Sequence, residues 1–338
     1  MATAAGGQKP NIRQVASLAG VSHMTVSRVI NDHPSIAPAT RERVLTVMRD
    51  LNYQPNSAAR ALATRKTNRI GVIVDSVVEF GPGSTVRAIE EAAHERGYTV
   101  STIAVDQRVS AADALTTLGA IGVDALCLIT PRSDSVELLR EGSLEIPTLV
   151  VKQEPETDFF TVAVDQRRGA RLAVEHLVGL GHRDILHLAG PLDWLDARAR
   201  EQEWRDCLDR ASLAARPVVV GDWTSDSGYA FGRTLGASPE FTAVFAANDQ
   251  MALGLIHALH ESGVRVPQDV SVVGFDDLPD ARHFLPPLTT VRQDFRALGT
   301  RSVETLLAEL EGRDAPTGAL IEPELIVRAS TAPPVVRP

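Results

Sequence analysis

The pattern of apolar and polar positions near the start of the chain predicts two short helices. One face of the first carries apolar residues at helical spacing, namely Ile12, Val15 and Ala19. The second repeats this spacing with Val26, Val29 and Ile30. Asn11 and Gln14 match a capping box, and Gly20 can adopt the left-handed conformation that ends a helix. Ser22 can then cap the second helix. Such a pair is typical of a DNA-binding helix-turn-helix, and an ordinary helical hairpin is the structural alternative.

A third helix is predicted to begin at Pro38, because proline suits the first turn of a helix. Its apolar stripe would close a three-helix core and consists of Val44, Leu45, Met48 and Leu51. The next candidate helix, residues 57–63, is only about two turns long. Because a helix of that length is marginal alone in water, we expect it to form only when something holds it.

From residue 70 the pattern changes to alternating apolar strands and amphipathic helices. Strands are expected at 70–74, 99–105, 125–130, 148–151, 161–164, 185–189, 217–220, 243–247 and 270–275. Helices are expected at 84–96, 111–119, 136–141, 168–180, 197–211, 228–235 and 251–262. This alternation predicts parallel sheets with helices on both faces, in two similar lobes that divide near residues 155–160. A late strand (290–293), helix (295–310) and strand (324–327) are expected to cross back between the lobes.

Charge is distributed unevenly along the 338 residues. Residues 1–69 hold ten Lys/Arg and three Asp/Glu, a net of +7, whereas the remainder has a net charge of −16. A basic head on an acidic body suits a nucleic-acid-binding module attached to a domain with another task. No membrane-length apolar run occurs, and residues 1–10 lack the apolar segment of a secretory signal, so we expect a cytoplasmic protein. Two buried free thiols are the simpler interpretation of Cys127 and Cys207, and a single disulfide between them is the alternative.

Polar residues follow several predicted strands, and in parallel sheets the ligand crevice lies at the carboxyl ends of the strands. These residues are Asp75, Thr130, Lys152, Asp165, Asn248, Asp249, Asp276 and Asp277, with Arg200 and Trp223 nearby. Carboxylates, amides and an aromatic face suit a sugar or another polyol. Each has a structural alternative: Asn248 or Asp249 capping the next helix, Trp223 in the core, and Arg200 in a surface ion pair.

A sugar-processing enzyme with a regulatory head is the alternative from another functional class. Its best acid–base pair is Asp276 and Asp277, but adjacent strand residues point to opposite faces and cannot flank one glycosidic bond. His257 and His260 share a helix face without an evident third metal ligand. No nucleophile-elbow or phosphate-loop motif occurs. We therefore expect no enzymatic activity, no cofactor and no metal. A transport solute-binding protein would need an export signal and would lack the basic head.

Together these segments resemble the LacI/GalR family of repressors. In the head, the similarity rests on residues 11–30, 40–43, 51–56 and 58–62. In the body, it rests on residues 174–177, 181–182, 188–191, 247–254, 271–277 and 286–290. The resemblance extends from residue 11 to about residue 328.

The resemblance implies an α+α/β architecture. Residues 11–55 would form a three-helix helix-turn-helix head and residues 56–68 a hinge helix and linker. Residues 69–330 would form a two-lobed, periplasmic-binding-protein-like effector and dimerisation domain, with tails at 1–10 and 331–338. The implied function is sequence-specific transcriptional regulation, as a repressor of a sugar-utilisation operon controlled by a small sugar between the lobes. The implied partners are a second copy of the chain and a near-palindromic double-stranded operator. The protein would be cytoplasmic, and nucleoid-associated when bound to its operator.

Family roles also transfer by position. The residues expected to contact bases in the major groove are His23, Met24 and Arg28. The residues expected to contact the DNA backbone are Asn11, Thr25, Ser27, Asn31 and Tyr53. The residues expected at the minor groove belong to the hinge and are Ala59, Arg60 and Leu62, and Leu62 would insert between base steps. The effector would contact Asp75, Arg200, Trp223, Asn248 and Asp276.

Three features depart from the family pattern. Ala37 leaves the third helix without a strong cap. Lys152 replaces a carboxylate of the lactose-type repressor, so the effectors need not be the same. Residues 332–338 lack a leucine-heptad tail, so we expect a dimer rather than a tetramer.

Overall fold

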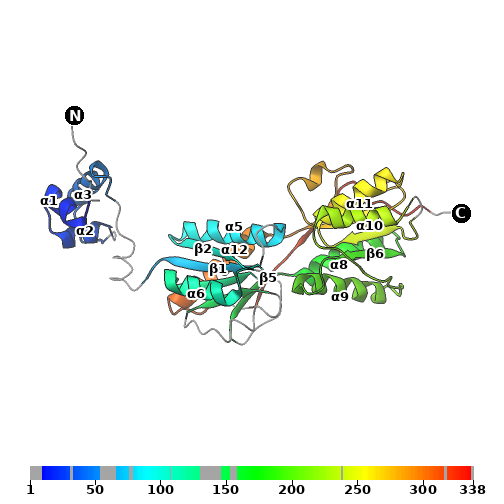
Figure 1. The fold of residues 1–338 in the computed structure, drawn as a ribbon, viewed down its shortest axis with the longest axis horizontal. Helices are drawn as coiled ribbons and strands as arrows, with labels where there is room; N and C mark the ends of the chain where they lie inside the picture. Colours follow the sequence, from blue (N-terminus) through cyan, green and yellow to red (C-terminus); the bar gives the residue numbers. More distant parts are fainter. Residues whose placement is uncertain are drawn as a thin grey trace. The chain divides into compact units, whose positions relative to one another are not determined.

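The computed structural model describes residues 10–30, 33–53, 66–75, 79–106, 108–129, 146–152, 158–236, 239–315 and 318–335. The chain divides into two compact units, Met1–Thr67 and Asn68–Pro338. The first unit is the helical head, and the second is a body that holds both sheets (Figure 1). The helix expected at 136–141 lies outside the described residues.

The head consists of α1 (Ile12–Ala19), α2 (His23–Ile30) and α3 (Pro38–Asp50). The capping box is confirmed, because Asn11 Oδ1 accepts from the backbone N–H of Gln14 at 3.1 Å and Gln14 Oε1 accepts from that of Asn11 at 2.8 Å. Gly20 has a φ of 63° and ends α1 as expected. Ala37 makes no side-chain cap at the start of α3.

The head core confirms the predicted apolar faces with one exception. Its buried residues are Val15, Ala16, Ala19, Val26, Val29 and Val44. Met48 and Leu51 pack against this cluster, but Leu45 is 42% exposed, so its assignment to the core was wrong. Val44, Met48 and Leu51 recur at helical spacing, whereas Leu45, the next residue, is rotated about 100° from Val44 around the helix axis.

The first lobe of the body is a parallel sheet with the strand order β11-β5-β4-β3-β1-β2. Its strands are β1 (Arg69–Val74), β2 (Thr99–Ala104), β3 (Ala125–Ile129), β4 (Thr148–Val151), β5 (Phe160–Val164) and β11 (Ala319–Ile321). Helices α5 (Phe80–Glu95) and α12 (Phe295–Leu310) cover one face, and α6 (Ala111–Ile121) covers the other (Figure 1). Separate apolar clusters fill the two sides of this sheet.

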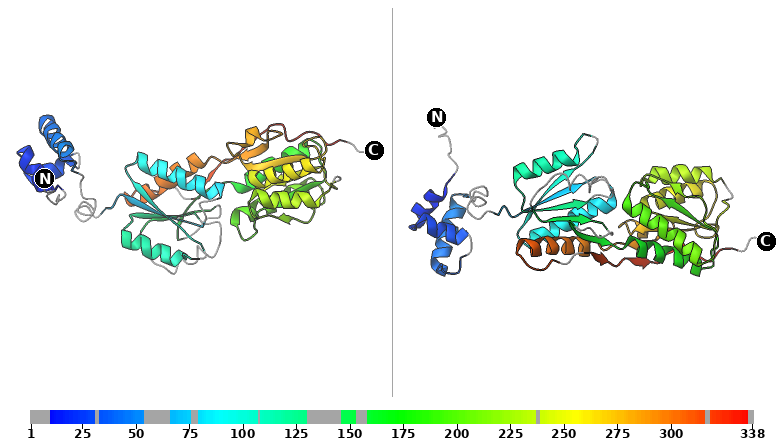
Figure 2. Two further views of the ribbon diagram at one scale, coloured as in Figure 1. Left: turned by 45° about the horizontal axis from the view of Figure 1, so that its top comes forward. Right: turned by 90° about the horizontal axis from the view of Figure 1, so that it is seen from below.

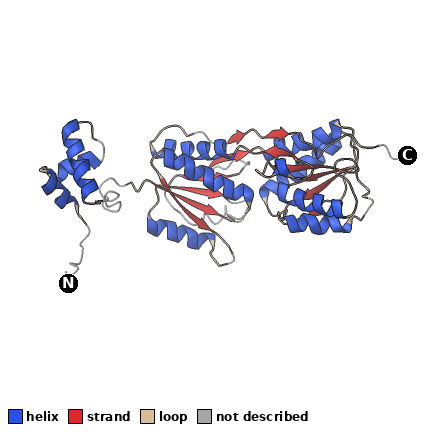
Figure 3. Ribbon diagram, turned by 90° about the horizontal axis from the view of Figure 1, so that it is seen from above, coloured by secondary structure: helices blue, strands red, loops and turns tan. Residues whose placement is uncertain are grey.

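The second lobe has the strand order β12-β10-β9-β8-β6-β7 and is parallel except for the β10–β12 pair. Its strands are β6 (Ile185–Ala189), β7 (Val219–Val220), β8 (Ala243–Ala246), β9 (Ser271–Asp276), β10 (Thr289–Arg292) and β12 (Glu324–Ile326). Helices α8 (Gln166–Gly179) and α9 (Leu195–Arg210) pack on one face. Helices α10 (Ser225–Thr234) and α11 (Asp249–Glu261) pack on the other, and a short 3₁₀ turn, η1, spans Ala281–His283. Figures 2 and 3 show each sheet between its helical layers.

Among the described residues, the chain passes between the lobes at three points: from β5 to α8, from β10 to α12, and from β11 to β12. The predicted division near 155–160 was wrong, because β5 pairs with β4 and belongs to the first lobe. The first crossing therefore comes at Asp165. The expectation that the late elements cross back is confirmed. Strand β11 escaped prediction because it has only three residues.

Both cysteines are buried free thiols, as expected. Burial raises the pKa of the Cys127 thiol to about 12. Among the helices that the structure describes, none is long and apolar enough to cross a membrane.

Candidate functional site

The exposed side of α2 carries the residues expected to contact bases. Val26 and Val29 turn inward, while His23, Met24 and Arg28 are exposed. Met24 is 56% exposed, which is unusual for a large apolar side chain and suits a surface that a partner covers. Ser22 caps α2, because its Oγ accepts from the backbone N–H of Thr25 at 3.1 Å.

The expected DNA-backbone residues occupy different environments in the head. Asn11 is exposed and already serves as the cap of α1. Thr25 and Ser27 are half-buried, and Tyr53 packs against the head core. Asn31 lies outside the described residues, as do the three hinge residues Ala59, Arg60 and Leu62.

A cavity lies between the two lobes of the body, and its two walls differ in character. The first lobe supplies a wall whose polar members are Glu79, Thr85 and Lys152 and which is otherwise apolar, including Phe80, Pro82, Ile129, Val151, Val164, Phe295 and Leu298. The second lobe supplies a polar and aromatic wall that includes Gln166, Trp194, Asp196, Arg200, Trp223, Asn248, Asp276 and Gln293. A ligand with hydroxyl groups on one side and an apolar opposite side would match this division.

Arg200 is the centre of the polar wall and is not the surface ion pair that was the alternative. It is buried, donates from Nε to Gln166 Oε1 at 2.9 Å, and donates from Nη1 to the carbonyl oxygen of Ala247. Its guanidinium lies 3.8 Å from the centre of the Phe275 ring, a cation–π contact. Burial lowers the pKa of Arg200, and nearby carboxylates including Asp276 oppose this.

Asp276 faces Arg200 from the end of β9. Its Oδ1 lies 4.0 Å from Arg200 Nη2 and accepts from Gln293 Nε2 at 2.6 Å. Burial raises the pKa of Asp276 to about 6, although Arg200 and Gln293 both favour the ionised form. The carboxyl group is therefore buried beside a cation and titrates in the mildly acidic range.

Two tryptophans form the aromatic part of the second-lobe wall of the cavity. The rings of Trp194 and Trp223 have centres 5.4 Å apart, and Arg200 lies 5.7 Å from the Trp223 ring. A Cβ atom at Gly190 would lie only 2.1 Å from the Trp223 ring, so glycine is required for this close approach. Trp223 is thus packed in the core and also exposed to the cavity. Its Nε1 has no hydrogen-bond partner in the described part of the chain.

Asn248 combines the two roles proposed for it. Its Oδ1 accepts from the backbone N–H of Met251 at 2.9 Å, which caps α11, and its Nδ2 donates to the carbonyl oxygen of Trp223 at 2.9 Å. It lines the cavity as well. Asn248 therefore links the helix start to the loop that carries Trp223.

The other strand-end residues divide between the cavity and structural roles. Lys152 lines the cavity, whereas Asp75 is not among the lining residues that the structure describes. Asp165 caps α8 by accepting from the backbone N–H of Arg168 at 2.8 Å. Asp249 is buried and accepts from the N–H of Leu278 at 2.8 Å, and burial raises its pKa well above the usual range.

Asp277 has a different environment from its neighbour Asp276. Its carboxylate oxygens lie 2.7 Å from Arg292 Nε and 2.6 Å from Arg328 Nη2. Only Asp276 of the two lines the cavity. This arrangement agrees with the expectation that the pair cannot flank one bond, and the described residues contain no cluster of three metal-ligating side chains.

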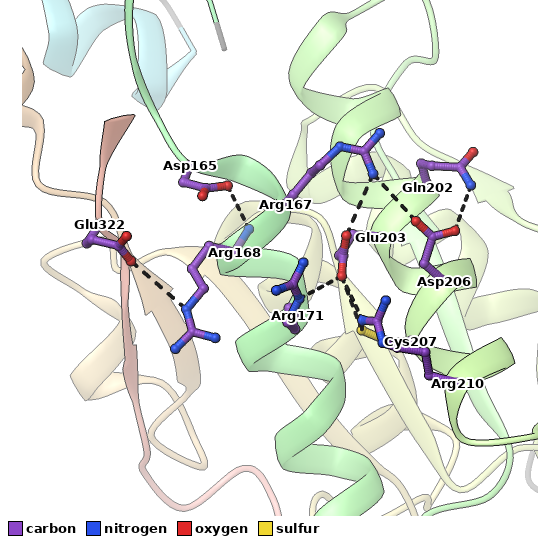
Figure 4. Close-up of polar contacts among 10 residues, drawn as sticks. All are labelled: Asp165, Arg167, Arg168, Arg171, Gln202, Glu203, Asp206, Cys207, Arg210 and Glu322. Carbon is purple, nitrogen blue, oxygen red and sulfur yellow. Dashed lines mark hydrogen bonds and ion pairs between the residues drawn. The ribbon is translucent and has the colours of Figure 1, made fainter. Parts of the chain in front are cut away.

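An ion-pair cluster around the buried carboxylate of Glu203 links α9, which carries Arg200, to α8, and its arginine partners are partly exposed (Figure 4). Glu203 is buried and accepts from Arg171 Nε at 2.8 Å and from Arg210 Nη2 at 2.7 Å. Arg167 Nη1 lies 3.6 Å from the second carboxylate oxygen. Glu203 is three residues after Arg200, so these bonds fix the turn of α9 that faces the cavity.

Several cavity residues are not among the strand-end residues expected from the sequence. Gln166 stands one position beyond Asp165, and Gln293 is itself the last residue of the expected strand 290–293. The signal for both is therefore their place at or one residue past the end of a strand. Trp194 and Asp196 come from the loop and first turn after β6, where no simple sequence pattern marks them.

Comparisons with known proteins agree with this architecture. A model of the bacterial regulatory proteins of the lacI family matches residues 11–56. A model of the periplasmic binding protein-like domain matches residues 174–331. The lactose operon repressor of Escherichia coli (strain K12) is 39% identical over 328 residues, which are 95% of this chain and 90% of that protein. The transcriptional regulator CelR of Thermobifida fusca is 34% identical over 337 residues, 96% of this chain and 98% of that one.

Solved structures give the same result. The lac repressor dimer bound to operator and the anti-inducer ONPF has a TM-score of 0.87 and 36% identity, covering 96% of this chain and all of that one. The CelR–cellobiose complex has a TM-score of 0.72 and 32% identity, covering 95% and 99%. The expected three-helix head and two-lobed α/β body are confirmed, and the relatives are DNA-binding regulators rather than enzymes. The chain belongs to the LacI family of bacterial regulatory proteins.

Proposed function

We propose that this chain is a homodimeric, operator-binding repressor whose affinity for DNA is controlled by a small sugar-like effector between the two lobes. The observation that carries the proposal is the cavity wall in which Arg200, Asn248 and Asp276 lie beside Trp223. Trp223 Nε1 has no hydrogen-bond partner among the residues that the structure describes. This supports a polar ligand, because a buried donor without a partner is costly and a ligand oxygen would satisfy it.

In the head, we propose that His23, Met24 and Arg28 contact bases in the major groove. Asn11, Thr25, Ser27, Asn31 and Tyr53 would contact the DNA backbone. Residues Ala59, Arg60 and Leu62 would act at the minor groove, and the domain boundaries would follow residues 11–55, 56–68 and 69–330. One head covers a short half-site and binds weakly, so two heads at fixed spacing give the affinity and the preference for a palindrome. Asp75 completes the proposed effector-binding set. Because it is not among the described residues that line the cavity, it would contact the effector only in a different arrangement of the lobes. We place this activity in the cytoplasm, with the bound protein on the nucleoid.

The ligand would act by binding one arrangement of the lobes more tightly than another. A change in the angle between the lobes would alter the spacing of the two heads and therefore operator affinity. Lys152 in the cavity distinguishes this site from that of the lactose-type relatives, so we do not assign lactose as the effector.

The experiment has two stages. A binding site is first selected from random duplexes with the purified chain, and a panel of mono- and disaccharides is screened by thermal shift. Gel shifts with the selected duplex are then repeated with each stabilising sugar. Arg28→Ala should weaken specific binding by about 10- to 100-fold, as expected for loss of a base contact, and leave the thermal shift unchanged. A chain that is monomeric at micromolar concentration and selects no palindrome would refute the proposal.

A further inference from the structure

Four buried side chains at the cavity form a closed ring. Arg200 Nε donates to Gln166 Oε1 at 2.9 Å, and Gln166 Nε2 donates to Gln293 Oε1 at 2.9 Å. Gln293 Nε2 donates to Asp276 Oδ1 at 2.6 Å, and that oxygen lies 4.0 Å from Arg200 Nη2. Each of the four residues is at most 7% exposed, and all line the cavity.

The two glutamines occupy equivalent places in the chain path. Gln166 begins α8, two residues after β5 ends in the other lobe. Gln293 follows β10 and lies two residues before α12 begins in the other lobe. Of the three crossings that the described residues make between the lobes, the ring therefore joins two, although Gln166 and Gln293 are 127 residues apart in sequence. It also joins both crossings to Arg200 and Asp276.

The chemistry of the ring fixes the direction of every hydrogen bond. Arginine has only donors and an ionised carboxylate has only acceptors. Because Gln166 Oε1 accepts the hydrogen bond from Arg200 Nε, the Nε2 group of Gln166 is turned toward Gln293 and donates to it. Gln293 must then accept with Oε1 and donate with Nε2 to Asp276. Each amide is oriented by its neighbour, so removing one member removes the reason for the orientation of the next.

We infer that Gln166 and Gln293 are positioning residues that connect the effector-binding pair Arg200 and Asp276 to the two crossings. A ligand hydroxyl that engages Arg200 or Asp276 competes with the ring and changes the restraint at both crossings. The inference rests on the proposed function of the cavity for its ligand, but the coupling between the two crossings does not require a ligand.

The coupling is tested by amide hydrogen exchange in the unliganded full-length protein. The variants are Gln166→Met and Gln293→Met, which keep the side-chain volume and remove the hydrogen bonds. The control is Gln202→Met, because Gln202 is exposed on α9 and donates to Asp206 (Figure 4). Gln166→Met should speed exchange about fivefold at residues 290–296 as well as at 163–168, and Gln293→Met should do the same in reverse. The control should change neither segment.

A double variant strengthens the test. If the ring acts as one unit, exchange in the double variant is no faster than in either single variant, because the first substitution has already released the second residue. Acceleration confined to the substituted crossing, or additive acceleration in the double variant, would overturn the inference. A thermal melt of each variant establishes that the fold is retained, and a variant that melts early is replaced by the corresponding Gln→Ala.

A second measurement separates this inference from the proposed function. Operator binding is measured with and without lactose, cellobiose and ONPG as probes. For any probe that changes the operator affinity of the wild type, the ratio of the affinities without and with the probe should fall at least threefold toward one in both glutamine variants. It should stay unchanged in Gln202→Met. An unchanged ratio in the glutamine variants would overturn the role in ligand response. If no probe affects the wild type, these sugars are not effectors, and the exchange experiment alone decides for or against the ring.

Discussion

Replacing Arg200 with methionine removes the centre of the cavity wall while keeping an extended side chain of similar length. The change removes the bond to Gln166, the bond to the carbonyl of Ala247, the ion pair with Asp276 and the contact with the Phe275 ring. It also removes the cost of burying the guanidinium, which offsets part of the loss.

The loss of stability depends on the polar groups that remain after Arg200 is removed. Gln166 Oε1 and the carbonyl oxygen of Ala247 are buried acceptors that lose their donor, at about 1–3 kcal/mol each. The cost of burying Arg200, which the variant no longer has, is subtracted from this sum. Asp276 keeps its bond from Gln293 but loses the cation that favours its ionised form. Breaking a buried pair by removing one partner costs about 3–5 kcal/mol. The charged atoms of Arg200 and Asp276 lie 4.0 Å apart, which is long for an ion pair. We therefore expect the free energy of unfolding to fall by about 3 kcal/mol at pH 8, the lower end of this range.

The loss should depend on pH with a definite sign. The pKa of Asp276 is about 6 in the folded wild type, above its usual 3.8. As the pH rises from 3.8 to about 6, the unfolded chain loses this proton before the folded chain does, so the free energy of unfolding falls. Without Arg200 that pKa rises further, and the penalty keeps growing above pH 6. The difference between variant and wild type should therefore be about 1–2 kcal/mol at pH 5, where the carboxyl group is protonated in both folded proteins, and larger at pH 8.

Urea denaturation followed by tryptophan fluorescence measures this difference, because all three tryptophans of the chain belong to the second lobe, namely Trp194, Trp204 and Trp223. The control is Arg205→Met on the same helix, whose side chain is 42% exposed and pairs with Glu201. It should cost under about 1 kcal/mol at either pH. An equal loss for Arg200→Met at pH 5 and pH 8 would show that Asp276 does not respond to Arg200, and the electrostatic reasoning would fail.

Three further predictions concern the head and the cavity. Asn11→Ala should destabilise the head by about 1 kcal/mol through loss of the capping box, seen as faster amide exchange in α1, and unchanged exchange would contradict it. Affinity for any sugar found in the screen should fall as the pH drops below about 6, because protonated Asp276 accepts fewer hydrogen bonds, and Asp276→Asn should flatten the profile of fluorescence titrations. Gly190→Ala should displace the Trp223 ring and weaken sugar binding at least tenfold by the same titration. Gly179→Ala, where a Cβ meets no atom within 4 Å, is its control and should leave the affinity unchanged.

The sequence predicts the elements of this chain well where each element carries its own signal. Asn11, Gln14 and Gly20 mark the ends of α1 through local hydrogen bonds and backbone conformation, and the structure places them as expected. The central strands β1, β3, β6, β8 and β9 are apolar runs, and their burial on both faces leaves a clear pattern. The division between the lobes is different, because it depends on which strand β5 pairs with, and pairing across the sheet leaves no mark in the local pattern.

The residues of the site also divide into those that local sequence patterns predict and those whose role depends on contacts between distant segments. Asn248 and Asp276 are found from their position after a strand, and Arg200 and Trp223 from their position nearby. The side chains that hold them are not, because Gln166 and Gln293 acquire their role only when two segments far apart in sequence meet. The assignment of Leu45 to the head core was wrong for a simpler reason, since apolarity alone does not specify which side of a helix faces the core.

The three passages between the lobes that the backbone makes in its described part limit how such a gene can be recombined. Each lobe of the body is assembled from separate stretches of sequence, so no single exchange of DNA can transplant one lobe intact into a relative. The head and the body, by contrast, are continuous segments that meet between Thr67 and Asn68. New pairings of DNA target and effector can therefore arise by a single crossover at that junction, whereas a new ligand preference requires changes within the body itself.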